Sequence, residues 1–289
     1  MNASRRTFLK SLGAAGAALC ARPALAYEPI PPLKVHRHVV ELGLARPFTV
    51  LHVSDSHLMA IDSRDDAARH ALADRRSRIG RELGSYYLDE ATAYARARGL
   101  RIVHTGDFMD FVTAANLENA ERRFKTDPYL ACVGNHEYHC GPTNEQESEK
   151  LPVLPQLRPA YPDGLPASVR EIGGVRFFVF DDSFCNVSEE VVAAFDRVAA
   201  EGRPLVLVCH VPLFAIRTAS AYWMKNGIRG REVLPRTWDF VNRVASAPCV
   251  KAVLCGHLHV HSQVRLSDAC TEYVTGALFD GVAQEIAFR

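Results

Sequence analysis

Aspartate, asparagine and histidine side chains recur along this 289-residue sequence in short clusters whose spacing suits metal ions. In chain order the candidates are Asp55, His57, Asp107, Asp110, Asn135, His136, Glu137, His210, His257 and His259. Asp55 and His57 are two residues apart, so in extended backbone both side chains can project to the same side and share one ion. His257 and His259 repeat that spacing with two imidazoles. Donors of this kind, with no thiolate among them, suit Mn²⁺, Fe²⁺, Fe³⁺ or Zn²⁺.

Taken singly, most of these clusters have ordinary structural explanations. An isolated Asp-x-His is equally typical of an Asp that caps a helix beside a hydrogen-bonded His. Asp107 could cap a turn after Gly106, and His210 alone is typical of a core or surface histidine. The run Gly134–Asn135–His136–Glu137 is more specific, because it sets an amide beside an imidazole at a tight turn. The metal hypothesis therefore depends on the whole set.

The elements that would position these residues follow an α/β pattern, in which each cluster comes directly after a short apolar run. The expected strands are residues 48–53, 100–104, 129–133, 175–180, 205–209 and 250–255, with helices over 81–98, 114–124, 189–200 and 235–244. Gly173 and Gly174 predict a hairpin turn within 169–180. Short strands over 263–266, 272–275 and 285–288 predict antiparallel pairing near the end. In α/β folds the carboxyl ends of strands carry the functional site.

Together and in this order, the clusters resemble the calcineurin-like metallophosphoesterase family, whose pattern is D-x-H, G-D-x-x-D, G-N-H-E, H and G-H-x-H. The whole pattern is present between Asp55 and His259, most of the chain. The resemblance implies a single α/β domain in which two mixed β-sheets pack as a sandwich with flanking helices. It also implies metal-dependent hydrolysis of a phosphate ester.

The resemblance assigns a role to each matching residue. It implies that Asp55, His57 and His259 hold one ion, that Asn135, His210 and His257 hold a second, and that Asp107 bridges the two. His136 would be a catalytic histidine that does not bind metal and that stabilises the phosphoryl group or protonates the leaving oxygen. Asp110 and Glu137 would orient neighbouring groups.

Two ions in such a cage would activate both the water and the phosphate. They leave a local charge of about +2 after two Asp are subtracted, and they lower the pKa of shared water. The resulting bridging hydroxide would attack phosphorus while the ions neutralise the phosphoryl oxygens. Two branches of the family fit poorly: Asp110 stands where purple acid phosphatases have a metal-bound Tyr, and Phe111 and Val112 stand where protein Ser/Thr phosphatases have Arg-Gly.

The first 26 residues resemble a twin-arginine (Tat) export signal of bacteria. Arg5 and Arg6 precede a mildly apolar stretch over 11–21, and Ala24–Leu25–Ala26 offers a cleavage site. The expected organisation is a signal peptide over 1–26 and a metallophosphoesterase domain over 27–289, exported to the periplasm or beyond. Its partners would be the export machinery and a small phosphorylated substrate. The longest apolar stretches are too short to span a membrane.

Charge and cysteine content exclude other classes. Loss of the leader, which carries four basic and no acidic residues, changes the net charge from +1 to about −3, so no nucleic-acid-binding surface is indicated. Seven cysteines remain, and none has the Cys-x-x-Cys spacing of a zinc ribbon. Cys132, Cys209 and Cys255 each end an apolar run, where cysteine usually serves as a small buried hydrophobe.

Two functions from different classes remain at this stage. The first is hydrolysis of a phosphomonoester or phosphodiester, and the alternative is a catalytically inactive scaffold that keeps the fold and binds a partner. Inactive relatives usually lose ligands, whereas this chain keeps them all, which favours the enzyme. Residues 137–161 and 214–231 are expected to shape the substrate pocket, with Tyr138, His139, Tyr222, Trp223 and Lys225 as candidate contacts, although each is equally typical of loop surface.

Overall fold

A computed structural model describes residues 30–77, 82–126, 129–140, 148, 150–214 and 233–289 of the chain. The chain divides into two units, Met1–Pro32 and Leu33–Arg289, and the described strands and helices belong to the second. The expected signal peptide and cleavage site, together with Tyr222, Trp223 and Lys225, lie outside the described residues. No helix in the described ranges has the length and apolar character needed to cross a membrane.

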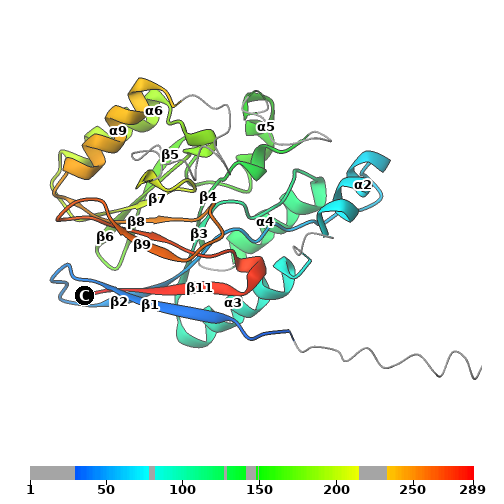
Figure 1. Ribbon diagram of the computed structural model, residues 1–289, viewed down its shortest axis with the longest axis horizontal. Coiled ribbons are helices and arrows are strands. Elements are labelled where there is room, and N and C mark those ends of the chain that lie inside the picture. Colours follow the sequence, from blue (N-terminus) through cyan, green and yellow to red (C-terminus); the bar gives the residue numbers. More distant parts are fainter. Residues whose placement is uncertain (1–29, 78–81, 127–128, 141–147, 149, 215–232) are drawn as a thin grey trace, which may run out of the picture. The chain divides into compact units, whose positions relative to one another are not determined.

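Two mixed β-sheets form the centre of the second unit (Figure 1). The first sheet has the order β1-β11-β2-β3-β4 and comprises β1 (Lys34–Val40), β11 (Val282–Phe288), β2 (Phe48–Val53), β3 (Arg101–Thr105) and β4 (Tyr129–Cys132). The second has the order β5-β6-β7-β8-β10-β9 and comprises β5 (Ala167–Ile172), β6 (Val175–Phe180), β7 (Leu205–Val208), β8 (Val250–Cys255), β10 (Thr271–Val274) and β9 (Ser262–Arg265). Strands β2, β3 and β4 are parallel, as are β6, β7, β8 and β10.

Alternation along the strands explains why the sheets pack face to face. Phe177 on β6 belongs to a buried cluster with Val103 on β3 and Leu130 on β4, which therefore lies between the sheets. Its neighbour Phe178 belongs to a second cluster with Phe195 and Phe240 on helices. Because successive side chains of a strand point to opposite faces, a strand that is apolar on both faces, such as the Phe177–Phe180 part of β6 or all of β7, can fill both clusters. This two-sided burial fixes the sandwich with helices outside.

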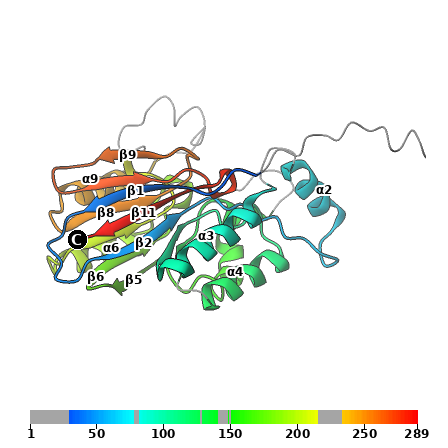
Figure 2. The ribbon, with the colours of Figure 1, turned by 90° about the horizontal axis from the view of Figure 1, so that it is seen from below.

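Helices cover the outer faces of both sheets (Figures 1 and 2). Those described are α2 (Ala67–Arg76), α3 (Gly84–Arg98), α4 (Ala114–Thr126), α5 (Lys150–Leu157), α6 (Glu189–Ala199) and α9 (Pro235–Ser246). Tyr129 on β4 contacts α3 through a hydrogen bond with Thr92 and α4 through the ring of Phe124. On the second sheet, α6 and α9 supply Phe195 and Phe240. The sandwich with flanking helices expected from the sequence is confirmed.

The expected elements are largely present, with a few corrections. The hairpin within 169–180 is confirmed, since β5 and β6 are antiparallel and both Gly173 and Gly174 have positive φ. The sequence did not predict β1, α2 or α5. The last three short strands also divide between the sheets: β9 and β10 extend the second sheet, whereas β11 enters the first between β1 and β2. As expected, Cys132, Cys209 and Cys255 are fully buried, and they are unpaired thiols.

Candidate metal centre

The carboxyl ends of strands from both sheets converge on one site. Asp55 and His57 follow β2, Asp107 follows β3, Asn135 and His136 follow β4, His210 follows β7, and His257 and His259 follow β8. Backbone hydrogen bonds tie these strand exits together, from Asp55 N to Gly106 O and from His57 N to Asp107 O, both at 3.0 Å. A third bond, from Gly256 N to His210 O at 3.0 Å, links the exits of β7 and β8. Residues far apart in the sequence thus share one framework.

Five of the candidate ligands adopt a left-handed backbone conformation. Their φ values are 56° for Asp55, 47° for His57, 52° for Asp107, 68° for His257 and 59° for His259. Such a conformation costs a residue with a Cβ on the order of 1–3 kcal/mol, and it persists where surrounding structure enforces it, often at functional sites. At these strand exits it turns each side chain away from its sheet position and toward the shared centre.

One group of ligand atoms comes from Asp55, His57 and His259. Asp55 Oδ1 lies 3.2 Å from His259 Nε2 and 3.7 Å from His57 Nε2, and the two Nε2 atoms are 3.3 Å apart. Asp55 Oδ1 is buried, yet it has no hydrogen-bond partner among the described residues. A buried carboxylate oxygen without a donor is costly unless something else compensates its charge. Its position among two imidazole nitrogens fits a cation site.

A second group comes from Asp107, His210 and His257. Asp107 Oδ2 lies 3.2 Å from His210 Nε2, and His257 Nδ1 lies 3.0 Å from the same nitrogen. Asn135 is buried beside this group, and the backbone N–H of the next residue, His136, donates to Asp107 Oδ1 at 2.9 Å. Asp107 Oδ2 is also 3.7 Å from His57 Nε2 of the first group. Asp107 therefore lies between the two groups.

The distances within each group fit ligands of a shared ion. Donors about 2.0–2.2 Å from one ion, at angles of about 90–125°, are separated from each other by roughly 2.8–3.9 Å. The five contacts within the groups range from 3.0 to 3.7 Å. Carboxylate oxygens and imidazole nitrogens are also the donors that divalent first-row metals accept. The residues present thus fit two metal ions.

Hydrogen bonds on the far side of two imidazoles, those of His57 and His210, orient these rings. Asp110 Oδ1 accepts from His57 Nδ1 at 2.7 Å, and the carbonyl of Thr105 accepts from His210 Nδ1 at 2.7 Å. In both residues the Nε2 lone pair is left to face the centre. A carboxylate or carbonyl that fixes the tautomer in this way raises the basicity of the ligand.

Glu137 anchors the backbone around Asp107. Its fully buried carboxylate accepts hydrogen bonds from the N–H groups of Asp107, Phe108, Met109 and Gly134. Burial, and then the charge of Asp107, raise the pKa of Glu137 to about 7. The carboxylate holds the exits of β3 and β4 together.

The negative charge of the centre calls for cations. Burial alone would raise the pKa of Asp55, but the imidazoles of His259 and His57 hold it well below its usual range. The pKa of Asp107 is also held well below its usual range, because the effect of His210 and His136 outweighs that of burial. Burial opposes protonation of His210, yet the field of Asp107 raises its pKa to about 10. Metal ions would occupy the place of such protons.

Two glycines of the motifs are explained by close approach of side chains. A Cβ on Gly134 would overlap Asp107 Oδ1, and one on Gly256 would overlap Ser54 Oγ and lie 2.5 Å from Asp55 Oδ2. Only glycine lets the backbone pass this close to a ligand carboxylate. The glycines of G-N-H-E and G-H-x-H are therefore part of the centre's construction.

His136 lies beside the candidate ligands and forms a third group of potential ligand atoms with His57 and Asp107. Its Nδ1 donates to the backbone carbonyl of Asp110 at 2.8 Å, and its ring lies edge-on to that of His57 with centroids 4.5 Å apart. One of its ring nitrogens falls within 4.8 Å of ligand atoms of His57 and Asp107. Because Nδ1 donates to the Asp110 carbonyl, Nε2 is the ring nitrogen left for other contacts.

Sequence reasoning missed two charged residues at the site. Arg76, at the end of α2, places its Nε 3.1 Å from Asp110 Oδ2. Asp182, just after β6, accepts from the backbone N–H groups of His210 and Val211. Asp182 could have been found from the sequence, because it is a polar residue directly after an apolar run, like the other clusters. Arg76 could not, because no sequence pattern predicts where α2 packs. Of the candidate substrate contacts, Tyr138 and His139 are fully buried.

Comparison with known sequences identifies the family. The sequence pattern of the calcineurin-like phosphoesterases matches residues 48–261, a span that contains all the candidate ligands. The chain belongs to this family. Metal ions are therefore implied by family membership as well as by the donor set. A search of curated proteins found no match.

Solved structures were compared with this chain as well. A dimetal phosphatase from Danio rerio is 14% identical over 81% of this chain and 88% of its own, with a TM-score of 0.53. A phosphopantetheinyl hydrolase from Mycobacterium tuberculosis is 15% identical over 80% of this chain and 90% of its own, with a TM-score of 0.45. At 14% identity, the likeness to the dimetal phosphatase shows the fold alone.

Proposed function

We propose that this protein hydrolyses phosphate esters, as a monoesterase or a diesterase, with a dinuclear metal centre. One ion would be held by Asp55, His57 and His259, and the other by Asn135, His210 and His257, with Asp107 bridging them. The observation that carries the proposal is the position of Asp107, whose Oδ2 lies 3.7 Å from His57 Nε2 and 3.2 Å from His210 Nε2. A carboxylate shared by two ligand groups is what a two-ion site requires.

The protein's own groups divide the remaining work. When bound, Mn²⁺, Fe²⁺, Fe³⁺ or Zn²⁺ ions would supply Lewis acidity toward the phosphate and lower the pKa of water. His136 is placed to give a proton from Nε2 to the departing alcohol oxygen, since its Nδ1 is held by Asp110. Asp110 and Thr105 keep His57 and His210 in the tautomers that present Nε2 to the centre. The side chain of His259 is 30% exposed, so substrate can reach the centre from that side.

Two variants and two substrates test this function. With added Mn²⁺, p-nitrophenyl phosphate or bis-p-nitrophenyl phosphate should be turned over, and the ratio of the rates separates monoesterase from diesterase. His136→Ala should keep its metal and lose most turnover, roughly 100-fold or more. Asp107→Ala should lose metal. Absence of turnover on both esters would favour the inactive scaffold, and equal metal loss in the two variants would contradict the roles.

We also propose that the protein is exported by the twin-arginine route and acts in the periplasm or outside the cell. The support is the order of Arg5 and Arg6, the apolar stretch over 11–21 and Ala24–Leu25–Ala26. Fractionation and N-terminal sequencing of the protein expressed in a bacterium should find a periplasmic chain that starts at Tyr27. Replacing both arginines by lysine should retain it in the cytoplasm, whereas Lys10→Arg should not. Export of the double variant would exclude this route.

A further inference from the structure

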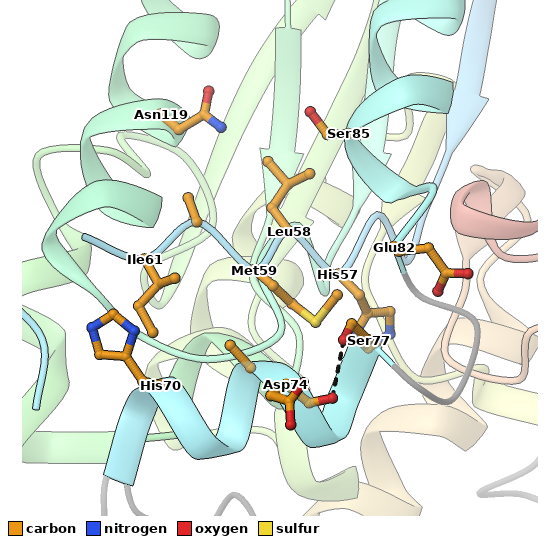
Figure 3. Close-up of a pocket in the computed structure, with 12 residues that line it drawn as sticks. His57, Leu58, Met59, Ile61, His70, Asp74, Ser77, Glu82, Ser85 and Asn119 are labelled. Atoms are coloured by element: carbon orange, nitrogen blue, oxygen red, sulfur yellow. Dashed lines mark hydrogen bonds between the residues drawn. The ribbon is translucent and has the colours of Figure 1, made fainter. Parts of the chain in front are cut away.

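A pocket of about 520 Å³ adjoins the metal centre (Figure 3). Its walls come from the chain after β2, from α2, from the start of α3 and from Asn119 on α4. His57 lines the pocket and is also a candidate ligand within 3.7 Å of Asp55 and Asp107. The pocket and the centre therefore share a wall. Nothing in the family pattern predicts this pocket, because α2 was absent from the sequence-based elements.

The interior of the pocket is apolar. Leu58, which is only 3% exposed, lines it together with the half-buried Met59, Ala60, Ile61 and Ala73. Helix α2 contributes His70, Ala73, Asp74 and Ser77, spaced so that they lie along one helical face. The exposed residues His70, Asp74, Glu82 and Ser85 supply polar groups at the mouth. The lining thus changes from apolar beside Leu58 to polar toward solvent.

The pocket adjoins the part of the centre formed by His57, which lies next to His136. The ring of His57, which lines the pocket, is 4.5 Å from the ring of His136, the proposed proton donor. Asp110 contacts both, at 2.7 Å from His57 Nδ1 and 3.3 Å from His136 Nδ1. A phosphate ester with its leaving oxygen next to His136 would extend its alcohol portion along this wall.

We propose that this pocket binds the alcohol portion of the substrate, and that this portion is apolar next to the phosphate and polar at its far end. The inference rests on the proposed phosphoesterase function and specifies its substrate class. Full burial of one methylene group strengthens binding about 4-fold. An open pocket buries the methylene only in part and gives roughly half of that free energy, which strengthens binding about 2-fold. The preference should stop growing once the pocket is filled.

A homologous series of n-alkyl phosphates, from ethyl to octyl, tests this directly. The series is made as monoesters or as methyl diesters, whichever class the aryl substrates show to be active. Leaving-group reactivity is nearly constant along it, so kcat/KM reports contact with the pocket. We expect about 2- to 4-fold per methylene over the first few carbons, followed by a plateau.

Two variants place the effect in this pocket. Ala73→Phe should bring the plateau to a shorter chain, because the ring fills the interior, and Ile61→Ser should lower the gain per methylene. Ala71→Phe is the matched control, since Ala71 is on the same helix but is exposed and does not line the pocket. Circular dichroism and thermal unfolding check that each variant is folded.

The failures can be told apart. A flat dependence on chain length, with p-nitrophenyl or bis-p-nitrophenyl phosphate still turned over, would overturn the pocket assignment and leave the proposed function intact. An identical chain-length profile in Ala73→Phe and Ala71→Phe would also overturn it. No turnover of any ester by the metal-loaded protein would overturn the proposed function, and this inference with it.

Discussion

Substitution of Asp110 should separate metal affinity from catalysis. In the structure the Asp110 carboxylate accepts from His57 Nδ1 at 2.7 Å and lies 3.3 Å from His136 Nδ1, while its backbone carbonyl accepts from His136 Nδ1 at 2.8 Å. Asp110→Ala removes the two carboxylate contacts and keeps the carbonyl that holds His136. We therefore expect the variant to bind metal weakly and to recover most of its turnover when metal is saturating.

The size of the effect follows from the contact with His57. A hydrogen bond to a charged group contributes about 1.5–3 kcal/mol, which corresponds to a loss of roughly 10- to 150-fold in metal affinity. Loss of comparable groups behind metal ligands typically costs about 10- to 100-fold. Asp110→Asn keeps an acceptor oxygen but loses the charge, so its loss should be smaller, about 3- to 10-fold.

Competition with a chelator of known affinity measures the difference. Wild type, Asp110→Asn and Asp110→Ala are titrated with Mn²⁺ or Zn²⁺ at one pH, and turnover is then measured at saturating metal. Chemical denaturation of the metal-free proteins shows whether the variants are folded. Wild-type metal affinity in Asp110→Ala would refute the orienting role of Asp110. A large loss of turnover that saturating metal does not restore would refute the separation of affinity from catalysis.

Three further predictions follow from buried contacts of the centre and the second sheet. Arg76→Ala removes an ion pair between a partly exposed arginine and Asp110, so metal affinity, measured by the same chelator competition, should fall less than about 10-fold. A loss of affinity greater than that of Asp110→Ala would contradict the inference that Asp110 matters more than Arg76. Gly256→Ala should lower the free energy of unfolding by about 1–3 kcal/mol, measured by denaturation, because the new Cβ overlaps Ser54; an unchanged value would show that the site relaxes freely. Burial raises the pKa of Glu272 from 4.5 to about 8, so its contribution to stability is fully present below about pH 4.5 and is lost as pH rises through about 8. Glu272→Gln should therefore reduce the fall in the free energy of unfolding between low and high pH by up to about 5 kcal/mol. If denaturation shows the same difference between pH 5 and pH 8 in wild type and in Glu272→Gln, the pH dependence does not come from Glu272.

Sequence patterns predicted the centre because its geometry depends on a local rule. Each candidate ligand comes directly after an apolar strand, and parallel strands bring their carboxyl ends to one edge, so Asp55 and Asp107 meet at the edge of the first sheet, while packing of the second sheet adds His257. The hairpin at Gly173 and Gly174 was predictable for a similar reason, since adjacent glycines accept the positive φ of a tight turn.

The missed features depend on contacts between distant segments. Strand β1 carries His36, Arg37 and His38 and lacks clear alternation, and it forms only because β11 offers an edge for parallel pairing. Arg76 matters because of where α2 packs, which no spacing within the helix reveals. The pocket beside His57 escaped prediction for the same reason, since four of its lining residues belong to α2 and the residue after it.

The most direct test of the account is anomalous diffraction from crystals of the protein loaded with Mn²⁺. Two peaks about 3.5–4 Å apart should flank the Asp107 carboxylate, one beside Asp55, His57 and His259 and the other beside His210 and His257. A single peak, or a pair located away from Asp107, would contradict the dinuclear centre.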